Sequence, residues 1–492
     1  MLYDKVVIIE KSSTALYVTC SANGRLAEAE HVSIFPFLKK TLTEYEWDAR
    51  RKINLTKYYY FKYDKPTGRL HLPVHILTLL GQYLNSNMVA WTTEPVLPNQ
   101  SMNITISSIG TFEDRDYQTE AIEFLTGGTG MKALELQTGD GKTYIAVRAV
   151  TELKLRTLIV VPAHLMEQWH GALTSMCDAK VEVIRGHKSI ADLVSSNYDT
   201  DVSVFLGSIN TLQNYASGDG LYNALPPFRE FIKRMMFGVK IVDECHLNFN
   251  ANVMIDIQSD ILHNIYLSAT HMRSSRGSNA IFHRIFPPDI KFDSGRTNHH
   301  VNITECRYDF GKIEDKYVST PRGYSEFKYE KLLLRSAKKL DAFINRVLRI
   351  VIDTYYINKK APGQKLLIIV GLRDFAEIIV EWLWEAYPEL KSTAFLHGID
   401  DEEIVNSDII VSTLGSAGTG RDIKKLRTMI MFTSFGSETL TLQSVGRLRK
   451  MEDTPEFVYL VNMGVTPHRR HADTKRPVYK HIAKQFNIVG CT

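Results

Sequence analysis

A glycine-rich loop at residues 136–143 constrains the fold of this chain more than any other feature. Its sequence is Leu-Gln-Thr-Gly-Asp-Gly-Lys-Thr, and an apolar segment at 144–150 follows it. Gly139 and Gly141 let the backbone approach a bound anion closely, and the first amide groups of a helix attract phosphate. Such a loop joins a strand to a helix, so the sequence predicts an α/β domain that binds a nucleoside triphosphate.

Two side chains at the end of this loop are suited to phosphate chemistry. Lys142 brings a positive charge to the β- and γ-phosphates, and the Thr143 hydroxyl can complete the coordination shell of Mg²⁺. The usual pattern has another glycine where this chain has Leu136, which we interpret as a variant. We expect ATP and Mg²⁺ as cofactors. The expected nucleotide-binding residues of the loop are Thr138, Gly139, Asp140, Gly141, Lys142 and Thr143.

A pair of carboxylates follows another apolar stretch further along the chain. Residues 237–242 have the composition of a buried strand, and Asp243 and Glu244 come directly after it. Parallel α/β sheets bind ligands at the carboxyl ends of their strands. We therefore expect Asp243 to hold Mg²⁺ together with Thr143, and Glu244 to orient and deprotonate the attacking water. With Lys142, these residues predict nucleoside-triphosphate hydrolysis.

The composition is that of an ordinary soluble protein with several domains. The chain has 492 residues, of which 44% are hydrophobic and 23% charged. No apolar run is long enough to span a bilayer, and the first residues lack the order of a secretory signal. We therefore expect a cytoplasmic protein with no membrane partner. The net charge of +4 does not by itself indicate nucleic-acid binding, so any basic surface must be local.

The five cysteines are scattered along the chain. They are Cys20, Cys177, Cys245, Cys306 and Cys491, and no two have the spacing of a metal-binding pair. This distribution argues against a disulfide framework and against a zinc site, and it fits a reducing compartment.

Residues 1–100 carry no nucleotide motif and are predicted to form a small α+β accessory domain. Short strands are expected at 5–9 and 15–19, and a helix at 73–84. A basic and aromatic segment at 50–69 lies between them.

Two regions, 105–295 (lobe 1) and 296–492 (lobe 2), alternate strands with helices. This pattern predicts two parallel sheets covered on both faces. In lobe 1, strands are expected at 158–162, 202–206, 237–242 and 265–268. In lobe 2, a helix is expected at 329–356 and strands at 365–370, 409–412, 428–432 and 457–460. Because only lobe 1 has a phosphate loop, we predict that lobe 2 completes its active site.

The order of short motifs resembles superfamily 2 helicases and translocases, which are built on two RecA-like lobes. The resemblance covers roughly residues 110–462. The matching segments are 115–118, 136–143, 160–169, 207–212, 243–246, 268–270, 368–373, 411–423 and 443–450. The resemblance therefore implies an α/β fold with two RecA-like lobes and a small N-terminal domain.

This resemblance assigns further residues to the nucleotide. Gln118 would read the adenine edge, with Arg115 or Tyr117 packed against the base. Arg447 would be a catalytic arginine that reaches the transferring phosphoryl group from lobe 2, so hydrolysis would require the lobes to close. The further nucleotide-binding residues implied in lobe 2 are Gly420, Asp422, Gln443 and Lys450. Lys450 stands where the family usually has a second arginine, and whether Arg449 or Lys450 supplies that charge stays open.

The resemblance also assigns residues to movement along a nucleic acid. His246, Ser268 and Thr270 would couple hydrolysis to motion. The implied nucleic-acid contacts are Pro162, Asn210, Thr211, Arg373, Thr413 and Ser416.

The segment at 50–69 and a basic C-terminal tail at 469–481 are similar to parts of the UvsW-type helicases of phages. That similarity implies a monomer that remodels forked or branched DNA, or duplex with single-stranded regions, with RNA–DNA hybrids among its substrates. If the protein is from a phage, its compartment would be the host cytoplasm. Two alternatives stay open: an RNA-directed helicase, and a scaffold subunit gated by ATP in a nucleic-acid-processing complex.

Overall fold

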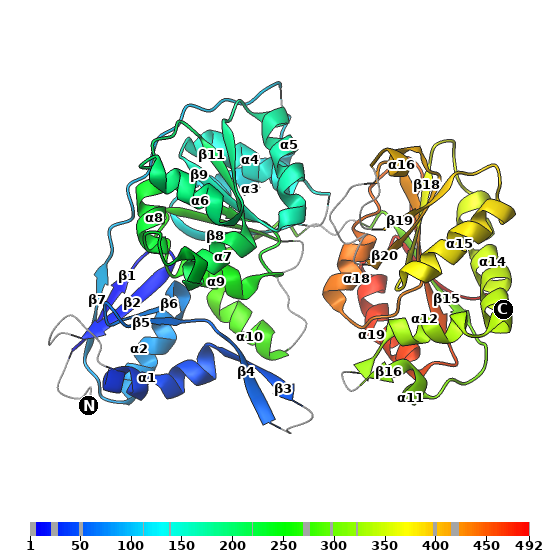
Figure 1. Cartoon of the computed structure of the whole chain (residues 1–492), viewed down its shortest axis with the longest axis horizontal. Helices are drawn as coiled ribbons and strands as arrows, with labels where there is room; N and C mark the ends of the chain where they lie inside the picture. The colour runs from blue at the N-terminus through cyan, green and yellow to red at the C-terminus, as the bar shows by residue number, and fades with distance from the viewer. Residues whose placement is uncertain are drawn as a thin grey trace. The chain divides into compact units, whose positions relative to one another are not determined.

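The computed structural model describes residues 6–20, 28–48, 53–111, 113–136, 139–218, 220–268, 276–295, 299–320, 323–396, 401–414 and 423–491. The chain divides into two compact units, Met1–Gly295 and Arg296–Thr492 (Figure 1). Each unit contains a seven-stranded sheet, and the first also contains a smaller, five-stranded sheet. Among the described helices, none has the length and apolar character needed to cross a membrane.

The N-terminal sheet has the strand order β5-β6-β2-β1-β7. Its neighbours pair antiparallel, except β1 and β7, which pair parallel. The strands are β1 (Val7–Lys11), β2 (Ala15–Cys20), β5 (Lys62–Asp64), β6 (Arg69–Pro73) and β7 (Trp91–Pro95). Helices α1 (Glu28–Thr41) and α2 (Leu77–Ser86) accompany the sheet. A separate hairpin of β3 (Thr43–Asp48) and β4 (Ile53–Tyr59) extends away from it (Figure 1).

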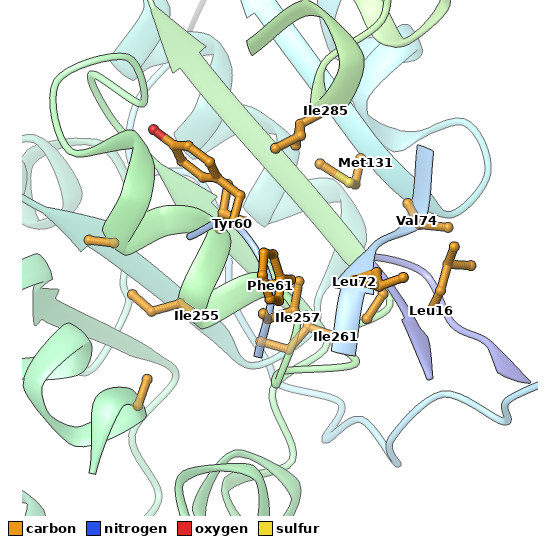
Figure 2. Close-up of a cluster of buried hydrophobic side chains, with 14 of the residues drawn as sticks. Leu16, Tyr60, Phe61, Leu72, Val74, Met131, Ile255, Ile257, Ile261 and Ile285 are labelled. Carbon is orange, nitrogen blue, oxygen red and sulfur yellow. The ribbon is translucent and has the colours of Figure 1, made fainter. Parts of the chain in front are cut away.

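The N-terminal sheet shares one hydrophobic core with lobe 1. Figure 2 shows side chains from both regions packed together. Those from the N-terminal region are Leu16, Tyr60, Phe61, Leu72 and Val74, and those from lobe 1 are Met131, Ile255, Ile257, Ile261 and Ile285. A hydrogen bond from the Thr14 hydroxyl to the Asp256 carbonyl, 2.8 Å long, adds a polar link. Because burial of apolar surface is the main stabilising contribution to folding, the two regions stabilise each other.

The lobe 1 sheet is entirely parallel, with the strand order β10-β11-β9-β12-β13-β8-β14. The strands are β8 (Gly130–Glu135), β9 (Thr157–Val161), β10 (Val181–Ile184), β11 (Val204–Ser208), β12 (Val239–Val242), β13 (His263–Ser268) and β14 (Lys291–Asp293). The helices are α3 (Asp116–Thr126), α4 (Lys142–Leu153), α5 (Met166–Met176), α6 (Gly186–Ser195), α7 (Ile209–Ser217), α8 (Phe228–Met235), α9 (Phe249–Asp256) and α10 (Arg276–Ile285). The strands β9, β11, β12 and β13 are buried at every position, as expected when helices cover both faces.

The lobe 2 sheet is also entirely parallel, with the order β19-β20-β18-β21-β22-β15-β23. The strands are β15 (Asn302–Tyr308), β18 (Lys365–Val370), β19 (Ser392–Phe395), β20 (Ile409–Thr413), β21 (Leu426–Met431), β22 (Glu456–Asn462) and β23 (Gln485–Gly490). The longer helices are α12 (Glu326–Leu334), α15 (Arg373–Ala386), α18 (Glu438–Val445) and α19 (Thr466–Ile482). A two-stranded hairpin, β16 (Ser319–Thr320) with β17 (Gly323–Tyr324), precedes α12. The predicted α/β fold with two RecA-like lobes is confirmed.

The helix predicted at 329–356 is interrupted. Helix α12 ends at Leu334, and the next helix, α13 (Ala337–Ala342), starts after a break. The Ser336 side chain accepts a hydrogen bond from the Lys339 amide, so it caps α13. Apolar periodicity alone does not reveal such a break, because Leu333 of α12 and the partly buried Leu340 of α13 pack against the same core.

The basic tail predicted at 469–481 is instead part of α19, which packs against the sheet. Lys475 is only 3% exposed and Tyr479 is fully buried, so neither is available to a nucleic acid. The Lys475 ammonium lies 5.0 Å from the centre of the Tyr459 ring. Arg469 and Arg470 remain exposed. The prediction of a basic tail is therefore wrong: the segment is a packed helix that buries Lys475 and Tyr479.

The cysteine spacing argued against a disulfide framework, and one pair of cysteines is nevertheless bonded. Cys306 in β15 and Cys491 after β23 form a disulfide, with their Cα atoms 6.0 Å apart. The two strands are neighbours in the sheet although the cysteines lie 185 residues apart in sequence. Spacing in the sequence does not predict such a pair, because only the strand order brings it together. Cys177 and Cys245 are buried free thiols.

Candidate functional site: the carboxyl edge of the lobe 1 sheet

The phosphate loop lies between β8 and α4, as predicted. Gly139 and Gly141 have φ angles of +100° and +87°, in the region that favours glycine. A Cβ atom on Gly141 would come within 2.8 Å of the Gln118 amide nitrogen, so a side chain there would displace that amide as well as strain the backbone. The Lys142 ammonium donates to the Leu136 carbonyl at 3.0 Å. Thr138 lies outside the described residues.

The acidic pair follows β12 at the same edge of the sheet. The Asp243 amide donates to the Val160 carbonyl of the neighbouring strand β9. The two carboxylate oxygens of Asp243 have separate donors: the Trp169 indole at 2.8 Å on Oδ2 and the Glu244 amide at 2.8 Å on Oδ1. Burial raises the pKa of Asp243, while the Trp169 indole and the positive charge of Lys142 act in the opposite direction.

Glu244 has the properties expected of a general base. Its φ of +48° lies in the left-handed region, which costs a non-glycine residue energy and is often found at functional sites. Burial and the adjacent charge of Asp243 raise the pKa of Glu244 to about 7, and the charge of Lys142 opposes this shift. A base whose pKa lies near neutral pH is well matched to proton abstraction from water.

Two of the predicted coupling residues are in contact. The Nδ1 atom of His246 lies 2.8 Å from the Ser268 hydroxyl, and 3.4 Å from a Glu244 carboxylate oxygen. This chain of contacts joins the residues after β12 to the end of β13. The third predicted residue, Thr270, lies outside the described residues.

The residues predicted to contact adenine brace the phosphate loop. The Tyr117 hydroxyl and the Gln118 amide both donate to the Asp140 carbonyl, at 2.9 and 3.3 Å. The Gln118 side-chain oxygen accepts from the Arg115 amide, and the Arg115 guanidinium donates to the Tyr117 hydroxyl. Recognition of adenine by these residues stays a prediction. The structure shows that Tyr117 and Gln118 hold the phosphate loop in place.

The residues present fit a magnesium ion. Asp243 and Thr143 offer oxygen ligands, which Mg²⁺ prefers, and Mg²⁺ typically takes few protein ligands beside substrate phosphates. No cluster of three or more His, Cys, Asp or Glu side chains suited to a metal occurs among the described residues. One carboxylate and one hydroxyl beside a phosphate loop match the magnesium chemistry predicted from the sequence.

The predicted nucleic-acid contacts of lobe 1 differ in exposure. Asn210, in the first turn of α7, is exposed, whereas Pro162 and Thr211 are buried. The Thr211 hydroxyl accepts a hydrogen bond from the Gly186 amide, so it holds α6 against α7. Of these three side chains, only that of Asn210 is on the surface.

In lobe 2, several predicted residues are described and others are not. Arg373 is exposed at the start of α15, Thr413 ends β20 and is partly buried, and Arg447 is partly buried just after α18. The Arg449 guanidinium lies 3.5 Å from the Gly446 carbonyl, and Lys450 is exposed. The residues outside the described part, or with an undescribed side chain, are Ser416, Gly420, Asp422 and Gln443.

Comparison with known proteins agrees with this geometry. Residues 111–273 match the family described as the res subunit of type III restriction enzymes. This range contains the phosphate loop, both carboxylates and Ser268. The resemblance to superfamily 2 helicases is confirmed. These matches indicate a helicase that uses ATP.

Relatives of this helicase-like chain include viral and archaeal proteins. It is 24% identical over 368 residues to "Putative helicase 161L" of Invertebrate iridescent virus 6, covering 71% of this chain and 77% of that protein. It is 25% identical over 351 residues to "Putative ATP-dependent RNA helicase QP509L" of African swine fever virus (isolate Pig/Kenya/KEN-50/1950), covering 65% of this chain and 63% of that protein. A 91-residue stretch, 18% of this chain and 20% of the relative, is 36% identical to "DNA 3'-5' translocase XPB2" of Sulfurisphaera tokodaii.

Two solved structures align with much of the chain. The structure of T4 UvsW has a TM-score of 0.36 and 15% identity, covering 99% of this chain and all of that one. S. cerevisiae Dbp5 bound to RNA and ADP BeF3 has a TM-score of 0.47 and 12% identity, covering 76% and 90%. At these scores neither superposition adds to the functional argument.

Sequence reasoning gave no role to Trp169. The residue ends the segment 160–169, which is one of the segments that resemble the helicase motifs. A tryptophan in a helix is ordinarily a core residue, and nothing local indicates that its indole would reach a carboxylate 74 positions later.

Proposed function

We propose that this protein is an ATP-driven motor that unwinds or remodels forked and branched DNA in replication, recombination or repair. One observation carries the proposal: Lys142, Asp243 and Glu244 gather at the carboxyl edge of one parallel sheet. The positive charge of Lys142 acts to lower the pKa of both carboxylates, so the three groups interact electrostatically.

In the proposed reaction, Lys142 binds the β- and γ-phosphates and Glu244 accepts the proton of the attacking water. Asp243 and Thr143 would hold Mg²⁺. When bound, the ion would neutralise charge on the phosphate oxygens. The amide groups after Gly139 and Gly141 would bind the phosphates through the N-terminus of α4.

We further propose that Arg447 stabilises the phosphoryl group during transfer. The motif at 443–450 supports this role, since an arginine supplied from a second lobe is worth about 10³- to 10⁵-fold in rate. Hydrolysis would then depend on closure of the lobes, and release of the products would allow them to open. Repetition of this cycle would move the motor along a strand.

The β3–β4 hairpin supports an interaction with nucleic acid. Tyr45 and Tyr59 are each 44% exposed and Tyr58 is 36% exposed, although large aromatic side chains are usually more buried. The Lys57 ammonium lies 5.5 Å from the centre of the Tyr58 ring. Aromatic rings beside a cation form a stacking surface for unpaired bases, so we propose that the hairpin contacts the substrate where strands separate.

An RNA-directed helicase is the second candidate. It is favoured by the name of the African swine fever virus relative, whereas the name of the archaeal relative favours DNA. Contacts to the phosphate backbone do not distinguish the two polymers by sequence.

ATPase assays on a panel of nucleic acids test the proposal. We expect forked DNA and four-way junctions to stimulate ATP hydrolysis by the wild-type protein most. The Glu244→Gln variant should lose about 10²- to 10⁴-fold in hydrolysis and retain nucleic-acid binding. Binding should weaken steeply with added salt, because released counterions supply much of the affinity. Stimulation by RNA alone would favour the second candidate. Hydrolysis that no nucleic acid stimulates, with no unwinding, would instead indicate an ATP-gated scaffold.

A further inference from the structure

The Trp169 side chain connects the core of lobe 1 to the acidic pair. Its ring is fully buried in the same apolar cluster as Leu134, Ile145 and Val161. Its indole nitrogen donates to Asp243 Oδ2 at 2.8 Å. An indole N–H is a donor only, and close packing leaves the ring one orientation. The core of the lobe therefore determines the direction from which Asp243 receives this hydrogen bond.

This hydrogen bond limits the rotation of the Asp243 carboxylate. Oδ1 accepts from the Glu244 backbone amide and Oδ2 accepts from the Trp169 indole, so each oxygen has one donor from a different part of the chain. A carboxylate oxygen has a second lone-pair site, which leaves both oxygens able to approach a cation. A ligand that is held in place in advance loses less conformational freedom on binding.

We propose that Trp169 is a positioning residue for the metal-binding carboxylate: its indole N–H orients Asp243 for the Mg²⁺ that accompanies the nucleotide. The inference rests on the proposed function, since Asp243 matters as a magnesium ligand only if this site hydrolyses a nucleoside triphosphate. A purely structural role predicts a different outcome: loss of the indole would lower stability and leave the magnesium dependence unchanged.

The test compares Trp169→Phe with Trp382→Phe in the full-length protein. Phenylalanine keeps an aromatic ring and removes the N–H. Trp382 is a matched control, because its indole donates to the Asn345 side chain at 3.2 Å in lobe 2. ADP binding is measured by calorimetry with and without Mg²⁺, and ATP hydrolysis is measured across a magnesium titration.

For Trp169→Phe, we expect ADP affinity without Mg²⁺ to remain near the wild-type value. The gain in affinity on adding Mg²⁺ should shrink about tenfold, as expected for one hydrogen bond to a charged group. The magnesium concentration for half-maximal hydrolysis should rise by a similar factor, and Trp382→Phe should match wild type in both measurements. A wild-type magnesium dependence in a folded Trp169→Phe protein would overturn the proposal.

A second measurement keeps the proposal testable if Trp169→Phe does not fold. In ¹⁵N-labelled protein, the Trp169 indole N–H resonance is assigned as the one that Asp243→Asn shifts. In the wild-type protein, this resonance should shift on addition of ADP with Mg²⁺ and should not shift with ADP alone. An indole resonance sensitive to Asp243→Asn but indifferent to Mg²⁺ would refute the positioning role. Absence of any magnesium-dependent hydrolysis by the wild-type protein would instead refute the proposed function, and this inference with it.

Discussion

The two lobes have the same strand order and different chemistry at the same edge. Numbered from the first strand of each lobe, both sheets have the order 3-4-2-5-6-1-7. In lobe 1 the Asp243 amide donates to the carbonyl of Val160 in the neighbouring strand, and in lobe 2 the Phe432 amide donates to that of Ile369 in the same way. One topological position therefore holds a carboxylate in lobe 1 and an aromatic ring in lobe 2.

The aromatic ring belongs to a packed cluster. Phe432 lies 4.7 Å from Phe343 and 5.3 Å from Phe375, measured between ring centres. The segment after β15, which corresponds to the phosphate loop, packs closely against other backbone: a Cβ atom on Gly464 would overlap the Gly311 carbonyl. The segment of lobe 2 after β15 is thus held in close backbone contact with the residues that follow β22.

Carboxylates at this edge of lobe 2 have structural partners. Glu330 of α12 accepts hydrogen bonds from the amides of Gly371 and Leu372, which follow β18. Glu326 accepts from the Ser434 amide, at 2.8 Å, and from the Tyr324 hydroxyl. These acids come from α12 and accept hydrogen bonds from residues that follow other strands, whereas Asp243 and Glu244 themselves directly follow β12. Two sheets of the same topology therefore carry different side chains at this edge, because those side chains depend on the residues that follow each strand.

The largest difference between the lobes is expected at the loops that follow the first strand of each sheet. Lys142→Ala should reduce ATP hydrolysis by about 10³- to 10⁵-fold, because it removes the charge opposite the transferred phosphate. Lys312→Ala, an exposed lysine in the corresponding segment of lobe 2, should leave hydrolysis unchanged. Steady-state ATPase rates measure both. Normal hydrolysis by Lys142→Ala would refute the assignment of the site to lobe 1.

A smaller effect is expected from the aromatic position of lobe 2. Phe432→Ala should destabilise this lobe by about 3–5 kcal/mol, since it leaves a cavity in a packed core. Urea unfolding followed by circular dichroism measures the change, and nucleotide binding by lobe 1 should persist at low denaturant. Phe327→Ala, at a residue that is 57% exposed in the same lobe, is the control. Equal stability of the two variants would show that Phe432 is not part of a tight core.

The smallest expected effect concerns pH. Burial raises the pKa of Glu326 to about 7, with the Ser434 amide and the Tyr324 hydroxyl acting in the opposite direction. The folded state therefore binds more protons than the unfolded state between the ordinary pKa of glutamate, 4.5, and about 7. The contribution of Glu326 to stability should fall as pH rises through this window. Glu326→Gln, which resembles the protonated acid, should flatten that part of the profile in urea unfolding, and an unchanged slope would contradict this account.

Much of the lobe 1 site could be predicted because its signals are local. Gly139, Gly141 and Lys142 are close in sequence, and a phosphate loop requires only a strand before them and a helix after them. Asp243 and Glu244 were recognisable because a run of apolar residues precedes them. Predictions of exposure failed where packing between distant parts of the chain determines burial. Lys475 and Tyr479 were predicted to belong to a basic tail, but they lie in α19, which buries them against the sheet.

The amino-acid sequence by itself determined that this chain has a phosphate loop, an acidic pair after a strand and two alternating α/β regions, since each is encoded by neighbouring residues. Only the tertiary structure decided that the N-terminal sheet shares a core with lobe 1, that Cys306 meets Cys491, and that the Trp169 indole reaches Asp243. The physical reason is that such contacts depend on strand order and close packing, which bring together residues that no local pattern relates.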